Sequence, residues 1–173
     1  MADNELATSA QRRAFVFDNH TCVVGYGRRT AGPSMSIVHY VMDGDRIVFL
    51  TMSERQKAKA VKRGVPLSVC VLAGHDRGLA WPPEYLVVDG TSELVTDMDY
   101  IVERAFGIGE VMRGEPVPAA ARPAVREMMT REKRVAVRFT PESTFHSPSV
   151  HPESDGKGGT KEMVHGLGAR LPW

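Results

Sequence analysis

The stretch Ile47–Arg63, IVFLTMSERQKAKAVKR, passes from an apolar run to a strongly basic one within a few residues. The β-branched and aromatic residues at its start predict a strand over Ile47–Thr51. Ser53 is followed three residues later by Gln56, the spacing of a capping box, which predicts that a helix begins here. Gly64 marks the C-terminal end of that helix. We therefore interpret the rest of the chain around a strand that leads directly into a basic helix.

Positive charge is concentrated in this segment. Residues 51–63 carry five basic side chains and one acidic side chain, whereas the whole chain has a net charge of only +1. The strand brings the chain to a helix N-terminus with the hydroxyls of Thr51 and Ser53 beside it, and such a place favours an anion. The segment predicts a phosphate site; the alternative is a solvated basic helix.

Helical geometry divides the basic residues into two groups. At about 100° per residue, Lys57 projects toward the apolar side of the helix, where it needs an anion or a route to water. The other basic residues share the outward face: Arg55, Lys59, Lys62 and Arg63. We expect Lys57 to act with Thr51 and Ser53 on a phosphate, apart from the outward group.

The flanking sequence predicts further strands linked mainly by hairpins. Helical periodicity covers residues 3–17, and strands are expected at 20–26, 34–42, 67–73, 85–95 and 135–139. Asp43-Gly44 is a strong hairpin signal, and Gly90 predicts a bend. Together with the strand at 47–51, these elements predict a mainly β (α+β) fold, a six-stranded barrel with short helices, rather than a doubly wound sheet.

A helical insertion and a tail complete this organisation. Residues 97–132 read as mostly helical, with breaks at Gly107–Gly109 and Gly114–Pro118. Residues 1–150 are expected to form the barrel domain. Residues 151–173 are expected to form a C-terminal tail, flexible around Ser154–Thr160. The methionines of the insertion either fill a core or line an adaptable apolar pocket; they are Met98, Met112, Met128 and Met129.

Composition excludes several classes of protein. The chain has 173 residues, 42% hydrophobic and 25% charged, which suits a single globular domain. A net charge of +1 argues against a nucleic-acid binder. Cys22 and Cys70 lie in apolar runs as buried thiols, and no Cys/His spacing predicts a metal site. No signal peptide or membrane-spanning run is predicted, so a cytoplasmic protein without membrane or nucleic-acid partners is expected.

Three other places carry candidate residues. His39 and Tyr40 are neighbours in a strand, so one of them faces any binding side of the barrel; the alternative is a core or interface role. Arg28 and Arg29 lie in a turn and are either solvated or a second anion contact. No nucleophile-elbow, P-loop, zinc-protease or dinucleotide motif is present.

The order of these features resembles one known family. It runs through paired strands, DGDRIVFLT (residues 43–51), the helix with Lys57, LSVCVL (67–72) and WPPEYLVVDGTSEL (81–94). This resembles the pyridoxamine 5′-phosphate oxidase-like, flavin-binding split β-barrel superfamily, and within it the actinobacterial flavin/deazaflavin oxidoreductases. The resemblance implies a homodimer with two cofactor sites at the subunit interface. It also implies a cofactor such as FMN or coenzyme F420, a deazaflavin, and in some members haem or FAD.

The resemblance implies roles for particular residues. Thr51, Ser53 and Lys57 would hold the cofactor phosphate, and the strand of Ser36, Val38 and Tyr40 would contact the cofactor. This sequence departs from the vitamin B6 oxidases because MSIVHYVM (35–42) contains no arginine or lysine and no pyridoxal phosphate site is recognisable. Positive charge is instead spread along a path that suits the longer anionic tail of F420 better than FMN: Arg28, Arg29, Arg55, Lys59 and Lys62.

The function expected from this resemblance is hydride transfer from reduced F420 to an unsaturated small organic substrate, in which Tyr40, His39 or water supplies a proton. The apolar insertion is expected to suit an apolar, polycyclic substrate, such as a biosynthetic intermediate. One alternative is an FMN-binding, NAD(P)H-linked reductase or oxidase. The others are a non-catalytic cofactor carrier and a structural dimer with a vestigial site.

Overall fold

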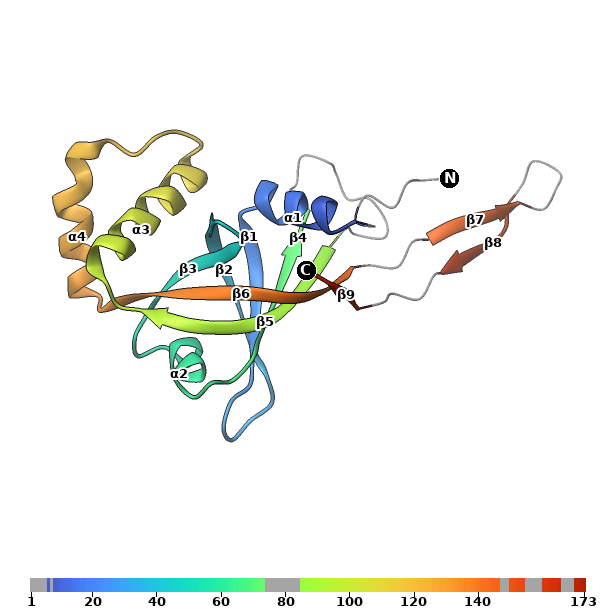
Figure 1. Cartoon of the computed structure of the whole chain (residues 1–173), viewed down its shortest axis with the longest axis horizontal. Coiled ribbons are helices and arrows are strands. Elements are labelled where there is room, and N and C mark those ends of the chain that lie inside the picture. Colours follow the sequence, from blue (N-terminus) through green and yellow to red (C-terminus); the bar gives the residue numbers. More distant parts are fainter. Residues whose placement is uncertain (1–5, 7, 74–84, 147–149, 155–159, 166–169) are drawn as a thin grey trace.

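The computed structural model describes residues 6, 8–73, 85–146, 150–154, 160–165 and 170–173. Its centre is an antiparallel barrel of six strands in the order β3-β2-β1-β4-β5-β6, closed by the pairing of β3 with β6 (Figure 1). The strands are β1 (Thr21–Tyr26), β2 (Ser34–Asp43), β3 (Arg46–Met52), β4 (Leu67–Leu72), β5 (Tyr85–Val95) and β6 (Arg134–His146). The predicted six-stranded barrel is confirmed.

Alternating side chains fill the barrel. Along β1 and β4 every second residue is buried, as expected for strands with one face on a core. Tyr40, Phe49, Leu67, Leu86 and Phe139 are completely buried and form much of this core. The Asp43-Gly44 hairpin forms as predicted, because Gly44 takes the left-handed conformation (φ 59°) that the tight turn requires.

The barrel splits between β2 and β3. These strands pair only where Tyr40–Asp43 faces Arg46–Phe49. Beyond that point Ser34–His39 pairs with β1, and Leu50–Met52 pairs with β6. The two strands therefore diverge, and each leaves an edge of backbone N–H and C=O groups facing the gap, which is a natural place for a ligand.

Four α-helices lie in the described part of the chain, together with a short 3₁₀ turn, η2 (Ala119–Ala121). The α-helices are α1 (Ser9–Asp18), α2 (Gln56–Lys62), α3 (Met98–Arg113) and α4 (Arg122–Arg131). The α1 helix starts at a capping box in which Thr8 accepts from the Gln11 amide (3.2 Å) and the Gln11 side chain accepts from the Thr8 amide (2.8 Å). The sequence predicted that this helix begins at residue 3, whereas α1 begins at Ser9.

The predicted capping box at Ser53 is wrong. The Ser53 amide donates to the carbonyl of Lys133 at 2.9 Å, so the chain still follows the start of β6 at this residue. Helix α2 begins at Gln56, and its N-cap residue is Arg55, in an extended conformation with no side-chain cap. The buried residues of the helix turn toward the barrel, as predicted: Ala58, Ala60 and Val61.

The insertion forms two helices that lie side by side at one end of the barrel (Figure 1). The predicted break at Gly107–Gly109 is wrong, because α3 runs through it. A Cβ at Gly107 would lie 3.3 Å from Val41, and one at Gly109 would lie 3.1 Å from Val117. These glycines therefore allow close packing rather than a turn. The second predicted break is confirmed, since Gly114 (φ 70°) ends α3.

Helix α3 is anchored to the β2–β3 hairpin by a polar cluster. The Tyr100 hydroxyl donates to Asp43 at 2.7 Å, and Arg104 lies 3.8 Å from the same carboxylate. Burial and the hydrogen bond with Asp43 raise the pKa of Tyr100 to about 12. The hydroxyl is therefore a stable donor at neutral pH, and the insertion is held as a fixed wall of the molecule.

Strands β5 and β6 are the longest, and β6 extends well beyond the predicted residues 135–139. The register between them shifts at Asp89–Gly90, which confirms the irregularity expected at Gly90. A Cβ on Gly90 would lie only 2.1 Å from the Thr140 carbonyl oxygen. Only glycine lets the two backbones approach this closely.

The C-terminal segment carries strands. β7 (Val150–Ser154) and β8 (Thr160–His165) pair with each other, while β9 (Leu171–Pro172) pairs with β6. Arg12 donates to the Pro172 carbonyl at 2.7 Å, which fastens the last strand to α1. Most of the stretch 154–160 and the Trp81-Pro82-Pro83 loop lie outside the described residues. In the described residues, no helix is both long and apolar enough to cross a membrane.

Candidate functional site

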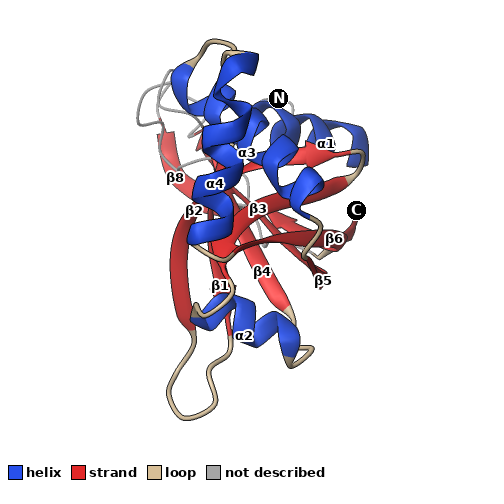
Figure 2. Ribbon diagram, turned by 90° about the vertical axis from the view of Figure 1, so that its left-hand side faces the viewer, coloured by secondary structure: helices blue, strands red, loops and turns tan. Residues whose placement is uncertain are grey.

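A cavity of about 790 Å³ occupies the split between β2 and β3. Its lining comes from both diverging strands, from the start of α2, from the first residue of β6 and from the α3–α4 pair. Figure 2 shows α2 and the α3–α4 pair in separate places along this side of the barrel. Elements far apart in the sequence therefore meet at one opening.

One end of the cavity is cationic. Arg55, Lys57 and Arg134 line it together with the buried Thr51, and no aspartate or glutamate is among the described lining residues. Burial lowers the pKa of Lys57, and the charges of Arg55 and Arg134 lower it further. Arg134 is compensated by an ion pair with Glu132 at 2.7 Å. Among the described residues, no carboxylate forms an ion pair with Lys57 or Arg55, so this end of the cavity favours an anion.

This attraction comes from side chains more than from α2 itself. The helix has seven residues, and its N-cap makes no side-chain hydrogen bond. Peptide dipoles add up along a helix, so a short one contributes little. Ser53, expected beside the phosphate, is not among the residues that line the cavity, whereas Thr51 and Lys57 both line it.

Strand β2 forms the polar side of the cavity. Ser36 and Val38, which share one face of the strand, line it, and so do Ile37 and His39 from the opposite face. The Ser36 hydroxyl is buried and has no hydrogen-bond partner among the described residues. A buried hydroxyl without a partner is costly, so a ligand group that bonds it would be favoured.

His39 and Tyr40, the two candidate proton donors, lie in different environments. His39 is exposed and lines the cavity, and its Nδ1 lies 2.9 Å from the Thr21 hydroxyl. Tyr40 is completely buried, and its hydroxyl donates to the Val16 carbonyl at 2.7 Å. Burial raises the pKa of Tyr40 far above its ordinary value. Tyr40 therefore lies in the core and is not among the described residues that line the cavity.

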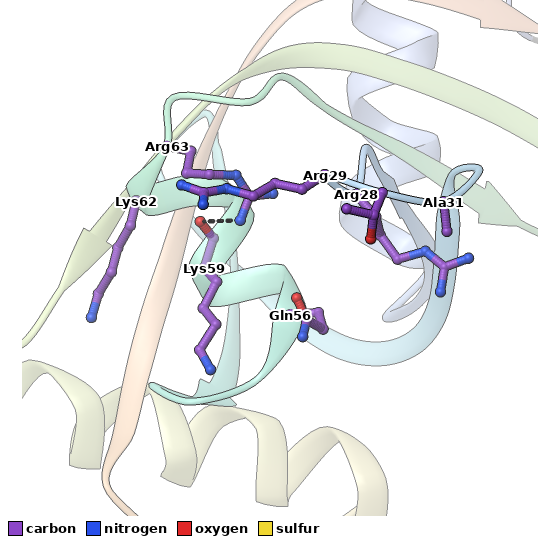
Figure 3. A pocket seen from close by; sticks show the side chains of 8 residues that line it. Arg28, Arg29, Ala31, Gln56, Lys59, Lys62 and Arg63 are labelled. Carbon is purple, nitrogen blue, oxygen red and sulfur yellow. Dashed lines mark hydrogen bonds between the residues drawn. The ribbon is translucent and has the colours of Figure 1, made fainter.

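A second, basic hollow of about 620 Å³ lies beside the first and shares Gln56 with it. Figure 3 shows the β1–β2 loop, with Arg28 and Arg29, facing the outward side of α2. The α2 side supplies Lys59, Lys62 and Arg63. Arg28 donates to the Gly32 carbonyl at 2.9 Å, and Arg63 donates to the Lys59 carbonyl at 3.0 Å. Backbone contacts thus fix these guanidinium groups without neutralising them.

Comparison with known proteins identifies the fold. No family model matches the chain, and no curated protein matches it by sequence. The structure is similar to a conserved hypothetical protein from Mycobacterium tuberculosis (TM-score 0.67, 22% identity, 79% of this chain and 82% of that one). It is also similar to an F420 reductase (TM-score 0.55, 18% identity, 76% and 94%). A third match is a proposed pyridoxamine 5′-phosphate oxidase from Listeria innocua (TM-score 0.53, 18% identity, 78% and 94%).

The fold is the pyridoxamine 5′-phosphate oxidase-like split β-barrel. The split of the barrel lies where β2 and β3 diverge, and the larger cavity occupies this split. The resemblance inferred from the order of sequence features is confirmed at the level of the fold.

The split barrel also brings in residues that the sequence analysis missed. Arg134 reaches the cavity because it pairs with Met52 across β3 and β6, a contact between distant parts of the chain. Arg55, expected on the outward face, lines the main cavity beside Lys57. The 100° rule does not apply to Arg55 because it precedes the first helical residue. The charge count over residues 51–63 includes Arg55 and Lys57, but only the pairing of β3 with β6 brings Arg134 beside them.

Proposed function

We propose that the protein is an F420-dependent oxidoreductase that transfers a hydride to an unsaturated small organic substrate. The observation that carries this proposal is the continuity of two basic hollows, one around Lys57 and one around Arg28 and Lys59, joined at Gln56. No carboxylate is among their described lining residues, and Glu54, which lies 3.3 Å from Lys59, is on the exposed side. A phosphate followed by a carboxylate-bearing chain matches that charge distribution. The solved F420 reductase of the same fold supports the proposal.

The residues of the cavity fit such a cofactor. Lys57 and Arg55 would bind the phosphate by charge-assisted hydrogen bonds, and Thr51 would add a hydroxyl. The partnerless hydroxyl of Ser36 and the free edge of β2 would hold the polar rim of the ring. When bound, the reduced deazaflavin supplies a hydride, so that a substrate double bond gains one hydride and one proton while the cofactor is oxidised.

The protein's own part is to position, to exclude water and to supply the proton. The apolar side chains of α3 and α4 close the cavity on the side away from α2. His39 is the cavity residue suited to carry the proton. If the Thr21 hydroxyl donates to Nδ1, the imidazole proton resides on Nε2, the atom left for a substrate.

The basic hollow favours F420 over FMN. FMN ends at its phosphate, so it would leave Arg28, Arg29 and Lys62 without an anion to bind, and Lys59 with only its exposed pair to Glu54. The glutamate tail of F420 continues past its phosphate and would neutralise them. Strand β2 adds no arginine or lysine between Ser34 and Asp43 that would concentrate charge on a single phosphate.

We also propose that the protein is a homodimer. An apolar row crosses the outer face of five strands through paired residues, none of them fully buried: Ile37, Val23, Cys70, Val87 and Phe145. An apolar row on an outer surface is a common sign of an interface. Ile37 also lines the main cavity, so a second copy on this face would border the cofactor site. Val23→Glu should convert a dimer to a monomer in light scattering; a dimeric Val23→Glu protein would contradict this assignment.

The proposed function is tested by titrating the purified protein with F420 and with FMN while following the fluorescence of each. We expect F420 to bind more tightly, and reduced F420 to be consumed when an acceptor is added. Tighter binding of FMN would favour an FMN-linked reductase. Tight binding of F420 without turnover by any acceptor would favour a carrier, and no binding of either cofactor would refute both flavin functions.

A further inference from the structure

The cavity has two chemically different ends. Its polar and charged lining comes from β2, β3, the start of α2 and the start of β6. The wall formed by α3, the following loop and α4 is almost entirely apolar: Ala105, Phe106, Ile108, Gly109, Met112, Val117, Val125, Met128 and Met129. With the cofactor phosphate at Lys57 and its ring against Ser36 and β2, as proposed above, this second wall remains for a substrate.

The apolar wall is a fixed surface. Phe106 and Met129 belong to a buried cluster with Val48 of β3 and Ala136 of β6. The hydrogen bond from Tyr100 to Asp43 holds the start of α3 on the barrel. A fixed wall of this kind can select a ligand by its shape.

Exposed apolar side chains mark the entrance. Six large hydrophobic residues are exposed among the described residues, and three of them line this one cavity: Ile37, Met112 and Met128. Met112 is 62% exposed and Met128 37% exposed. Exposed apolar groups gathered at the mouth of a cavity indicate a binding site, and methionine adapts to varied ligand shapes.

We propose that the α3–α4 wall is the substrate compartment, that it takes an uncharged apolar molecule containing a ring, and that Met112 and Met128 determine its specificity. This inference rests on the proposed function. The charged groups lining the cavity are cationic, so a cationic substrate is repelled. An anionic substrate competes with the cofactor for Lys57 and Arg55. An uncharged ring packs against Phe106 and the methionine sulfurs, and it is neither repelled by the cationic groups nor in competition with the cofactor for them.

Binding of an uncharged fluorescent probe tests the compartment directly. N-phenyl-1-naphthylamine is titrated into the cofactor-free full chain, and saturable enhancement of its fluorescence is expected. Met112→Glu and Met128→Glu should each weaken its binding by about tenfold or more, because a carboxylate then lies at the apolar entrance. The matched control is Phe17→Glu, which changes an equally exposed residue (62%) that lines a different hollow. Equal binding by all four proteins, or no saturable binding, would overturn the proposal.

The same variants separate this inference from the proposed function. F420 should bind Met128→Glu within about threefold of wild type, whereas Lys57→Met should bind F420 roughly 10- to 100-fold more weakly and keep the probe. If F420 fails to bind wild type while the probe pattern holds, the cofactor assignment is wrong and the apolar compartment stands. If F420 binds but the glutamate variants keep the probe, the compartment is wrong. A change of oligomeric mass in Met128→Glu would show that this rim is an interface between copies, which also overturns the proposal.

Discussion

Replacing Lys57 with methionine should remove much of the affinity for the cofactor while sparing the fold. Methionine keeps the length and apolar character of the lysine stem, so the packing of α2 on the barrel is preserved. A hydrogen bond to a charged group contributes about 1.5–3 kcal/mol, and tenfold in affinity corresponds to about 1.4 kcal/mol. Because Lys57 is half-buried and no acid is among the described residues that line its cavity, we expect the Kd for F420 to rise roughly 10- to 100-fold.

The same change should not destabilise the cofactor-free protein. Folding lowers the pKa of Lys57 below its ordinary 10.5, so the fold disfavours the charged form. Burying the charged Lys57 therefore lowers the free energy of unfolding. This loss of stability is fully present below the pKa that Lys57 has in the folded protein, and it disappears as the pH rises from that pKa to 10.5. At neutral pH Lys57→Met removes the cost, and the Tm of the variant should equal or exceed that of wild type.

The matched control is Lys62→Met, which changes an exposed lysine on the same helix that lines only the neighbouring basic hollow. Fluorescence titration measures the Kd, and a thermal melt without cofactor measures the Tm. We expect Lys62→Met to weaken binding of F420 by no more than about fivefold, since an exposed charge pair contributes about 0–1 kcal/mol. If Lys57→Met binds F420 as wild type does, or if both variants lose affinity equally, the phosphate does not lie at Lys57.

Three further predictions concern the cavity and the barrel. The affinity for F420 should fall as the pH rises through the lowered pKa of Lys57, with a midpoint below 10.5, and a Kd that is flat with pH up to 10.5 would contradict this. Gly90→Ala should lower the free energy of unfolding by about 3 kcal/mol or more in urea, because the new Cβ meets a carbonyl oxygen at 2.1 Å; Gly32→Ala, with nothing within 4 Å, should change it by less than about 0.5 kcal/mol. Tyr100→Phe should cost about 1 kcal/mol by removing the donor to Asp43, and an unchanged midpoint would show that this bond does not hold α3.

Much of the barrel could be predicted because its signals are local. Alternation along residues 34–42 and the Asp43-Gly44 turn each identify an element without reference to the rest of the chain, and the structure confirms both. The glycines of α3 show the limit of this approach. Gly107 and Gly109 look like helix breakers in the sequence, yet they are small because Val41 and Val117 pack against them. That reason depends on contacts between distant residues.

Some residues of the candidate site could likewise be predicted from local sequence, and others could not. Lys57 could be separated from Lys59 and Lys62 by helical arithmetic, and the structure places them in two different hollows. Arg134 could not be found, because it enters through the pairing of β3 with β6. The Ser53 capping box failed because a backbone hydrogen bond to Lys133 competes with the helix start. Local rules therefore located the cationic segment, and tertiary contacts decided which of its members share a cavity.

We have proposed that one cationic cavity holds the cofactor phosphate and that an adjoining basic hollow holds an anionic tail. The most direct measurement compares the Kd of three ligands with the purified protein: the deazaflavin ring with its ribityl chain and no phosphate, the same molecule with the phospholactyl group, and full F420 with its glutamates. We predict that affinity rises at each step, that Lys57→Met abolishes the first increase, and that charge reversal of Arg28 and Lys59 abolishes the second. Equal affinities for the three ligands would contradict the account, because neither basic surface would then contact the cofactor.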